Sequence, residues 1–163
     1  MVSVPSSPIR RVRLLGVPTG LYSRYTLHVE AVERDAWQAI EHDQGPKERL
    51  QRAMALLDVF GRFRLPNRQA YTQALTAGAT SFDLELEVPP DLVDDVLPFL
   101  DAMEDLDAMA KAGEAPLPTA LADIVAFRRW LIGEVHGQLD GQEPVPYSEE
   151  RTRALRPKPD DRA

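Results

Sequence analysis

The three histidines are the side chains best suited to acid–base or metal chemistry, because the ordinary pKa of imidazole lies near neutral pH. His28 lies beside an apolar stripe, His42 lies between two acidic residues, and His136 precedes Asp140 by four positions. Two ligands do not complete a metal site, and neither HExxH nor a similar spacing occurs. The sequence therefore predicts a half-buried structural His28, an exposed His42 and no metal.

Other motifs of catalytic and nucleotide sites are missing. The sequence contains neither GxGxxG nor GxxxxGK[ST] nor GxSxG, and residues 16–20 are too short and proline-blocked to hold a phosphate. Cysteine is absent, which excludes a thiolate nucleophile. The carboxylates of residues 94–105 are typical of a solvated helix face, because an acid–base pair would need burial to separate its pKa values. We therefore expect a protein that is not an enzyme and needs no cofactor.

The composition indicates one globular domain. The chain has 163 residues, of which 44% are apolar and 28% charged, which suffices to bury a core. No apolar run approaches the roughly 20 residues that span a bilayer, and no signal-peptide apolar region precedes Gly16. A net charge of −7 argues against nucleic acid as the main partner. These features predict a cytoplasmic protein that binds neither membrane nor nucleic acid.

Charge is distributed unevenly along the chain. Residues 1–78 carry 11 Lys and Arg against 7 Asp and Glu, whereas residues 79–163 carry 8 against 19. The acidic residues concentrate between positions 82 and 114. This asymmetry fits either a solvated acidic face or oriented docking with a second copy or a charged partner.

The elements that must position these residues follow from hydrophobic periodicity. Apolar and polar residues alternate in two strands, and apolar stripes at steps of three and four predict the helices between and after them. The expected elements are a strand over 11–17, a helix to about Glu41, a helix after Pro46, a short helix capped by Asn67, a strand over Ser81–Val88, an acidic helix capped by Asp91 that kinks or restarts at Pro98, and a last helix whose stripe begins at Leu121.

A shift of 71 residues aligns the two halves of the chain. It places Leu15 on Leu86 and Val17 on Val88, and it aligns the following helices in order. We predict a mostly helical α+β fold in which two strand–helix–helix repeats, about 9–78 and 79–140, join through a small antiparallel strand pair packed against helices. The pair would have two free edges, which favours a homodimer.

The ends of the chain differ in composition from the 9–140 domain. Residues 1–8 contain two prolines and three serines and read as a flexible leader. Residues 141–163 are rich in proline and charge and read as a flexible tail.

The most distinctive segment runs from Phe127 to Glu134, with the sequence FRRWLIGE. Arg128 falls near an apolar stripe and would need a carboxylate partner if buried, which the preceding acidic helix could supply. One interpretation is an internal ion pair of Arg128 or Arg129, with Trp130 covering the core. The other is a docking surface, because Arg and Trp dominate binding energetics.

This segment, together with Val17-Pro18, residues 87–90 and Pro144-Val145-Pro146, resembles a family of small uncharacterised actinobacterial proteins. The likeness covers roughly residues 12–147, and FRRW-x-x-GE is its specific part. Members are often encoded beside anti-sigma-factor kinases, STAS-domain antagonists and regulatory phosphatases. The resemblance implies an accessory of partner-switching regulation, with a partner of the anti-sigma or anti-anti-sigma type, and it brings no catalytic residues.

Three functions follow as hypotheses. The first is a regulatory adaptor that binds a protein partner or itself. The second is a small-molecule sensor with a pocket between the repeats, lined by Tyr25, Trp37, Phe99 and Trp130. The third is an enzyme that pairs His28 or His136 with a carboxylate. The candidate binding residues are Arg128, Arg129, Trp130, Glu134, Tyr25 and Trp37.

Overall fold

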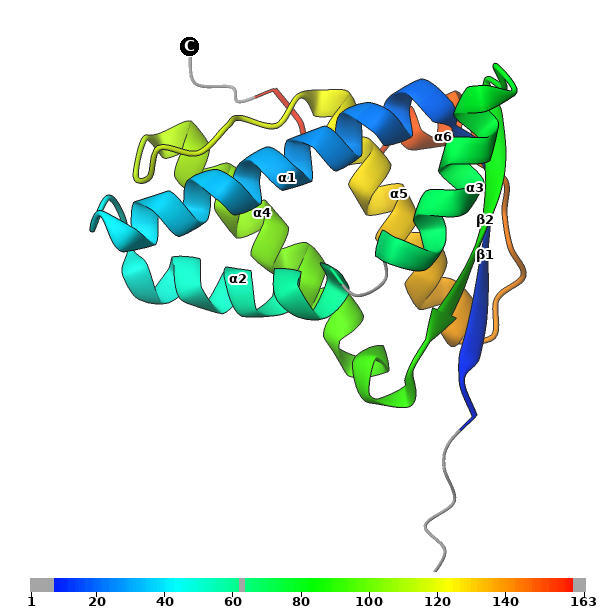
Figure 1. Cartoon of the computed structure of the whole chain (residues 1–163), viewed down its shortest axis with the longest axis horizontal. Coiled ribbons are helices and arrows are strands. Elements are labelled where there is room, and N and C mark those ends of the chain that lie inside the picture. The colour runs from blue at the N-terminus through cyan, green and yellow to red at the C-terminus, as the bar shows by residue number, and fades with distance from the viewer. Residues whose placement is uncertain (1–7, 62–63, 160–163) are drawn as a thin grey trace, which may run out of the picture.

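A computed structural model describes residues 8–61 and 64–159, and the side chains of 64–67 are outside this description (Figure 1). Apart from Pro8, the predicted leader lies outside the described residues. In chain order the elements are β1 (Arg10–Pro18), α1 (Thr19–Glu41), α2 (Lys47–Gly61), α3 (Arg64–Thr76), β2 (Ser81–Val88), the 3₁₀ helix η1 (Pro90–Asp95), α4 (Val96–Ala112), α5 (Ala122–Leu139) and α6 (Glu149–Arg153). The predicted mostly helical α+β fold is confirmed.

β1 and β2 form the predicted antiparallel pair. Arg10 lies opposite Val88, and the register shifts by one residue between Leu14 and Val17. Gly16 lies in this bulge with a φ of +64°, a conformation that suits glycine. Its N–H donates to the Asp83 carboxylate at 2.8 Å, so the irregular position still has a hydrogen-bond partner.

The two faces of the strand pair differ as their alternating sequences predict. Val12, Leu14 and Leu84 are buried on the inner face. On the outer face the Arg11 guanidinium lies 3.7 Å from the Glu85 carboxylate. Figure 1 shows the strands at one end of the molecule, with α1, α4 and α5 extending away from them. The core therefore lies between the inner face of the sheet and the helices.

Most predicted helices are present, but three of their ends differ. α3 begins at Arg64, so Asn67 lies inside the helix and is not its cap. Asp91 is not an N-cap either, because Pro90 opens η1 and α4 begins only at Val96. The chain thus restarts a helix at the expected place, with Pro98 in the first turn, where a missing N–H is tolerated.

Leu121 was expected in the core but is 64% exposed. It occupies the N-cap position of α5, where the backbone is still extended. The helical stripe therefore starts one turn later than the sequence suggested.

The 71-residue shift matches the element boundaries. Adding 71 to the bounds of β1 gives 81–89, which is β2 plus one residue, and adding 71 to those of α1 gives 90–112, the span of η1 and α4 together. The origin of this match in a duplication stays a prediction.

Residues 144–156, here named the C-terminal segment, contact the domain instead of forming a separate tail. The Tyr147 N–H donates to the Leu15 carbonyl at 2.9 Å, and Thr152 of α6 is buried. The boundary predicted at residue 140 is therefore wrong. Proline and charge signalled an irregular backbone, but apolar and backbone contacts hold that backbone against β1 and α5.

The outer edge of β1 is also occupied. The Gln138 side chain accepts from the Arg13 N–H and donates to the Arg13 carbonyl, both at 2.8 Å, as a neighbouring strand would. Together with the Tyr147 bond, this contact covers one of the two edges that were expected to be free for a homodimer.

Candidate functional site

A partly open apolar pocket of about 120 Å³, here called the cavity, lies between the inner face of the sheet and the helices. Both halves of the 71-residue repeat contribute to it. Tyr25 and Phe99 line it as predicted, whereas Trp37 and Trp130 do not. The lining residues are Leu14 of β1; Tyr22, Tyr25, Thr26 and Val29 of α1; Phe60 of α2; Leu84, Leu86 and Val88 of β2; Val96 and Phe99 of α4; and Leu131, Ile132 and Val135 of α5.

The chemistry of this cavity is that of an apolar binding site. Its described lining contains no carboxylate, imidazole or basic side chain. The Thr26 hydroxyl is used within its own helix, where it lies 2.9 Å from the Ser23 carbonyl. Enclosed apolar cavities of roughly 150 Å³ bind benzene or xenon, and this partly open pocket has a comparable volume and lining. The cavity thus fits a small uncharged hydrocarbon-like molecule or fragment.

One helical turn from the cavity, the half-buried His28 and Asp107 and the buried Arg128 form a charged cluster between α1, α4 and α5. Arg128 is 0% exposed, and its Nη2 donates to the Asp107 carboxylate. Among the described residues, its Nε and Nη1 have no hydrogen-bond partner, and neither has Nε2 of His28. An unpaired buried polar group costs about 1–3 kcal/mol, and a charged one costs more. The core therefore contains a group of polar atoms that packing alone does not satisfy.

Burial shifts the pKa values of both titratable members of the cluster. Removal from water lowers the pKa of His28 below 6.5, an effect that Asp107 opposes and Arg128 reinforces. Burial raises the pKa of Asp107 above 3.8, although the charge and hydrogen bond of Arg128 act in the opposite direction. Both shifts show that the interior disfavours the charged forms.

The cluster and the cavity share the same helices. His28 lies three residues after Tyr25 and one before Val29, and Arg128 lies four residues before Ile132. Tyr25, Val29 and Ile132 all line the cavity. Neither the cavity nor the two surface grooves described below is lined by His28, Asp107 or Arg128.

The FRRWLIGE segment has the internal role that the first interpretation assigned to it. Arg128 pairs with Asp107 as above, and Arg129 Nε donates to Glu104 of the same acidic helix at 2.5 Å. Trp130 is buried and packs edge-on against Tyr147, with ring centroids 5.2 Å apart. The prediction of an exposed Arg/Trp docking patch is therefore wrong for Arg128 and Trp130.

The same segment also holds the C-terminal segment in place. Glu134 accepts from the Val145 N–H at 3.1 Å, and Arg129 Nη1 donates to the Leu155 carbonyl at 2.9 Å. The Phe127 ring lies 6.2 Å from that of Tyr147. One face of FRRWLIGE thus contacts α4 and another contacts the C-terminal segment.

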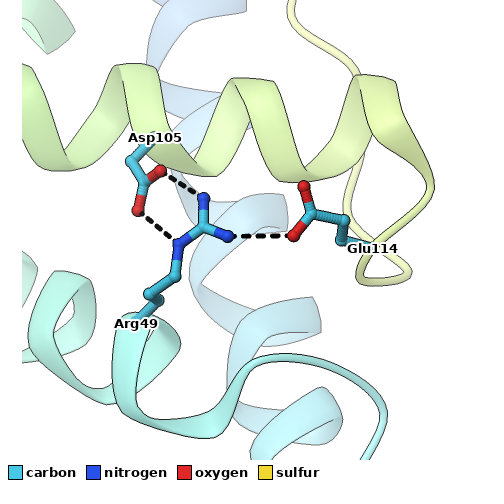
Figure 2. A network of polar contacts seen from close by, with 3 residues as sticks. All are labelled: Arg49, Asp105 and Glu114. Carbon is cyan, nitrogen blue, oxygen red and sulfur yellow. Dashed lines mark hydrogen bonds and ion pairs between the residues drawn. The ribbon is translucent and has the colours of Figure 1, made fainter.

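The acidic residues of α4 are not only a solvated face. Figure 2 shows Arg49 of α2 between Asp105 of α4 and Glu114 of the following loop. Arg49 Nε donates to Asp105 at 3.2 Å and Nη1 donates to Glu114 at 2.9 Å. The Arg49 hydrogen bond, followed by the Arg49 charge, holds the pKa of Asp105 below 3.8. The uneven charge of the sequence is thus partly paired within the chain, since Arg49 comes from its basic half.

The remaining histidines lie outside the cluster. His42 is exposed, as predicted, and its Nδ1 lies 2.8 Å from the Gln38 carbonyl. His136 borders a groove of about 290 Å³ with Asp94 and Asp140. A larger groove of about 510 Å³ lies between α1, α5 and α6. Among the described residues, no group of three or more His, Cys, Asp or Glu is arranged to hold a metal ion.

Of the six candidate binding residues, only Tyr25 lines the cavity. Trp37 is 52% exposed on α1 and lies apart from it. Asp107 was not predicted as a member of the site, although a signal for it existed: it follows the buried Met103 by four residues and so falls on the core stripe of α4. The contribution of β2, whose inner face was recognised but not assigned to a cavity, was not predicted either.

Among the described residues, none of the helices has the length and apolar character of a membrane span.

Comparison with known proteins adds no further constraint on this site. No protein-family model matches the chain, and neither a curated protein nor a solved structure shows significant similarity to it. The actinobacterial resemblance therefore stays a prediction.

Proposed function

We propose that this chain is a non-catalytic regulatory protein that binds a small apolar molecule in the core cavity. The observation that carries the proposal is the cavity itself, which has an almost wholly apolar lining and lies between the two halves of the fold. Apolar pockets at the junction of structural units are the usual place for small-molecule recognition.

A molecule bound in this cavity would affect the positions of several elements at once. A bound molecule would contact the inner face of the sheet through Leu84, the end of α2 through Phe60, and α5 through Leu131. A ligand shifts a conformational equilibrium only if it binds one arrangement better than another. Contacts with elements from both halves supply such a difference, because the ligand favours the arrangement in which both halves close around it.

A cavity-filling substitution tests this function. Val135→Phe places a ring in the space that the ligand would use, so benzene should raise the melting temperature of the wild type but not of this variant. The measurement is differential scanning calorimetry with saturating benzene, with xenon as a second probe. Val59→Phe is the control, because Val59 lies on α2 outside the cavity lining. An unchanged wild-type melting temperature with both probes would reject the proposal.

A second candidate is the regulatory adaptor, which would act in partner switching on an anti-sigma or anti-anti-sigma protein or on a second copy. The exposed Trp37 favours it, because Trp is the residue most enriched in binding hot spots. Leu27, on the same helix, is also exposed. In this candidate the docking helix is therefore α1, through these two exposed side chains, and not the FRRWLIGE segment.

The adaptor candidate is tested with purified anti-sigma-factor kinases and STAS-domain proteins from the source genome. Trp37→Ala should weaken binding by about tenfold or more, since a hot-spot truncation costs about 2 kcal/mol or more. Leu121→Ala is the matched control, because Leu121 is a comparably exposed apolar residue at another position. Surface plasmon resonance measures both variants, and equal affinities would count against docking through Trp37. Sedimentation velocity on the same samples tests for a homodimer.

A further inference from the structure

We propose that the half-buried His28 makes occupancy of the apolar cavity depend on pH, with protonation of its imidazole weakening ligand binding. The inference rests on the proposed ligand-binding function and adds its regulation. It is carried by the cluster of His28, Asp107 and Arg128 and by the position of that cluster one turn from the cavity wall.

The charged groups near His28 include too few unpaired carboxylates to stabilise a second cation beside Arg128. The charges that act on His28 are those of Asp107 on α4 and Arg128 on α5, and Glu104 of α4 acts on Asp107. Glu104 is paired with Arg129 at 2.5 Å, and Asp107 is paired with the fully buried Arg128. The buried residues of α2, which also packs on α1, are all apolar. A protonated His28 would therefore compete with Arg128 for the single carboxylate of Asp107.

The unpartnered atoms point to the same conflict. Within the part of the chain that the structure describes, Arg128 Nε and Nη1 and His28 Nε2 have no hydrogen-bond partner. Protonation of the imidazole would make both ring nitrogens donors in a cluster that is short of acceptors, and the added charge would be only partly solvated. The expected response is a local loosening of α1 from α4 and α5.

This loosening of α1 would move the walls of the cavity directly. His28 lies between Tyr25 and Val29, which both line the cavity. On α5, Leu131 and Ile132 line it one turn after Arg128. Movement of α1 away from α5 would separate walls that an apolar ligand must touch on both sides. The ligand would then bind best to the state in which His28 is neutral.

The direction of the effect follows from the lowered pKa of His28. As the pH falls through about 6.5, the unfolded or loosened chain takes up a proton that the closed fold resists. The closed state therefore loses stability on acidification and is most favoured above that pH. By linkage, a ligand that favours the closed state shifts the titration of His28 to still lower pH.

The test compares benzene binding at about pH 5.5 and about pH 7.5, on either side of the ordinary imidazole pKa. We expect the full-length wild type to bind benzene about fivefold more weakly at the lower pH, near the low end of usual coupling between sites. His28→Gln keeps a neutral polar side chain, so its affinity should be the same at both values. His42→Gln is the control and should behave as the wild type, because His42 is exposed.

A second readout does not depend on a variant that folds. The imidazole proton signals of His28, followed by NMR in the wild type, should titrate at lower pH with benzene than without it. Equal benzene affinity at the two pH values, or a titration unmoved by benzene, would overturn the inference and leave the cavity function intact. Absence of benzene binding at both values would reject the cavity function itself and the inference with it.

Discussion

Replacing Asp107 by alanine is expected to lower the free energy of unfolding by about 3–5 kcal/mol, the usual cost of breaking a buried ion pair. Arg128 is 0% exposed and its one hydrogen bond within the described chain goes to Asp107. Without that carboxylate, a permanently charged guanidinium remains in the core with no hydrogen-bonded counter-charge among the described residues. Urea unfolding followed by circular dichroism measures the change.

Two further variants separate this cause from simple loss of packing. Glu104→Ala breaks a pair whose side chains are about one-third exposed, so it should cost only about 1 kcal/mol or less. The double variant Asp107→Leu/Arg128→Met replaces both charges by apolar groups and should be neutral or stabilising by about 1–4 kcal/mol. A loss for Asp107→Ala no larger than that for Glu104→Ala would contradict the assignment of a buried, uncompensated charge.

The acidic helix α4 has a structural role that its charge alone did not reveal. Glu104, Asp105 and Asp107 each pair with an arginine, and the arginines come from α2 and α5. The half-exposed contact with Arg49 stabilises less than the buried one with Arg128, because water screens it. The carboxylates of α4 thus fix its position between two neighbouring helices, and fewer of them remain for an external partner.

Periodicity made the strands and long helices predictable from the sequence. Residues 81–88 alternate so regularly that their strand was predicted with the bounds it has. The apolar stripe of α1 likewise anticipated the buried Tyr25, Val29 and Val32. Patterns of this kind work because, inside a helix or strand, a residue's position in the period determines which face its side chain occupies.

The predictions that failed depend on contacts between distant residues. Leu121 continues the stripe of α5 in sequence, but the helix has not yet begun there, and its side chain is largely exposed. The composition of the C-terminal segment is typical of a mobile tail, yet Tyr147 contacts Leu15 and Trp130, which are more than 15 residues away in the sequence. Backbone propensity carries no information about such partners, which is why local signals misplace both features.

The candidate site likewise contains one feature that the sequence predicted and others that depend on contacts between distant residues. Arg128 was recognised as a residue that would need a carboxylate, and the acidic helix was named as its source. The convergence of Asp107 and His28 upon it was not predicted, because three helices must first pack before those side chains meet. The cavity was anticipated only as a pocket between repeats, since a packing void depends on side-chain volumes that periodicity does not specify.

Replacing Phe127 by alanine should cost about 3–5 kcal/mol, the usual range for removing a buried aromatic ring. The ring is 0% exposed and lies 5.3 Å from Tyr25 and 5.7 Å from Trp130, measured between ring centroids. Truncation therefore leaves a void at the centre of an aromatic cluster that joins α1, α5 and Tyr147. Thermal and urea unfolding of the variant measure the loss.

Leu121→Ala provides the contrasting case within the same helical stripe. The sequence places Leu121 and Phe127 on one apolar face, whereas the structure buries only the second. We expect the Leu121 variant to unfold within about 0.5 kcal/mol of the wild type, as surface substitutions do. Comparable losses for the two variants would mean that α5 begins earlier than Ala122 and that Leu121 is part of the core. A large loss for Phe127 alone supports the packing of α5 described above, including its contact with Tyr147.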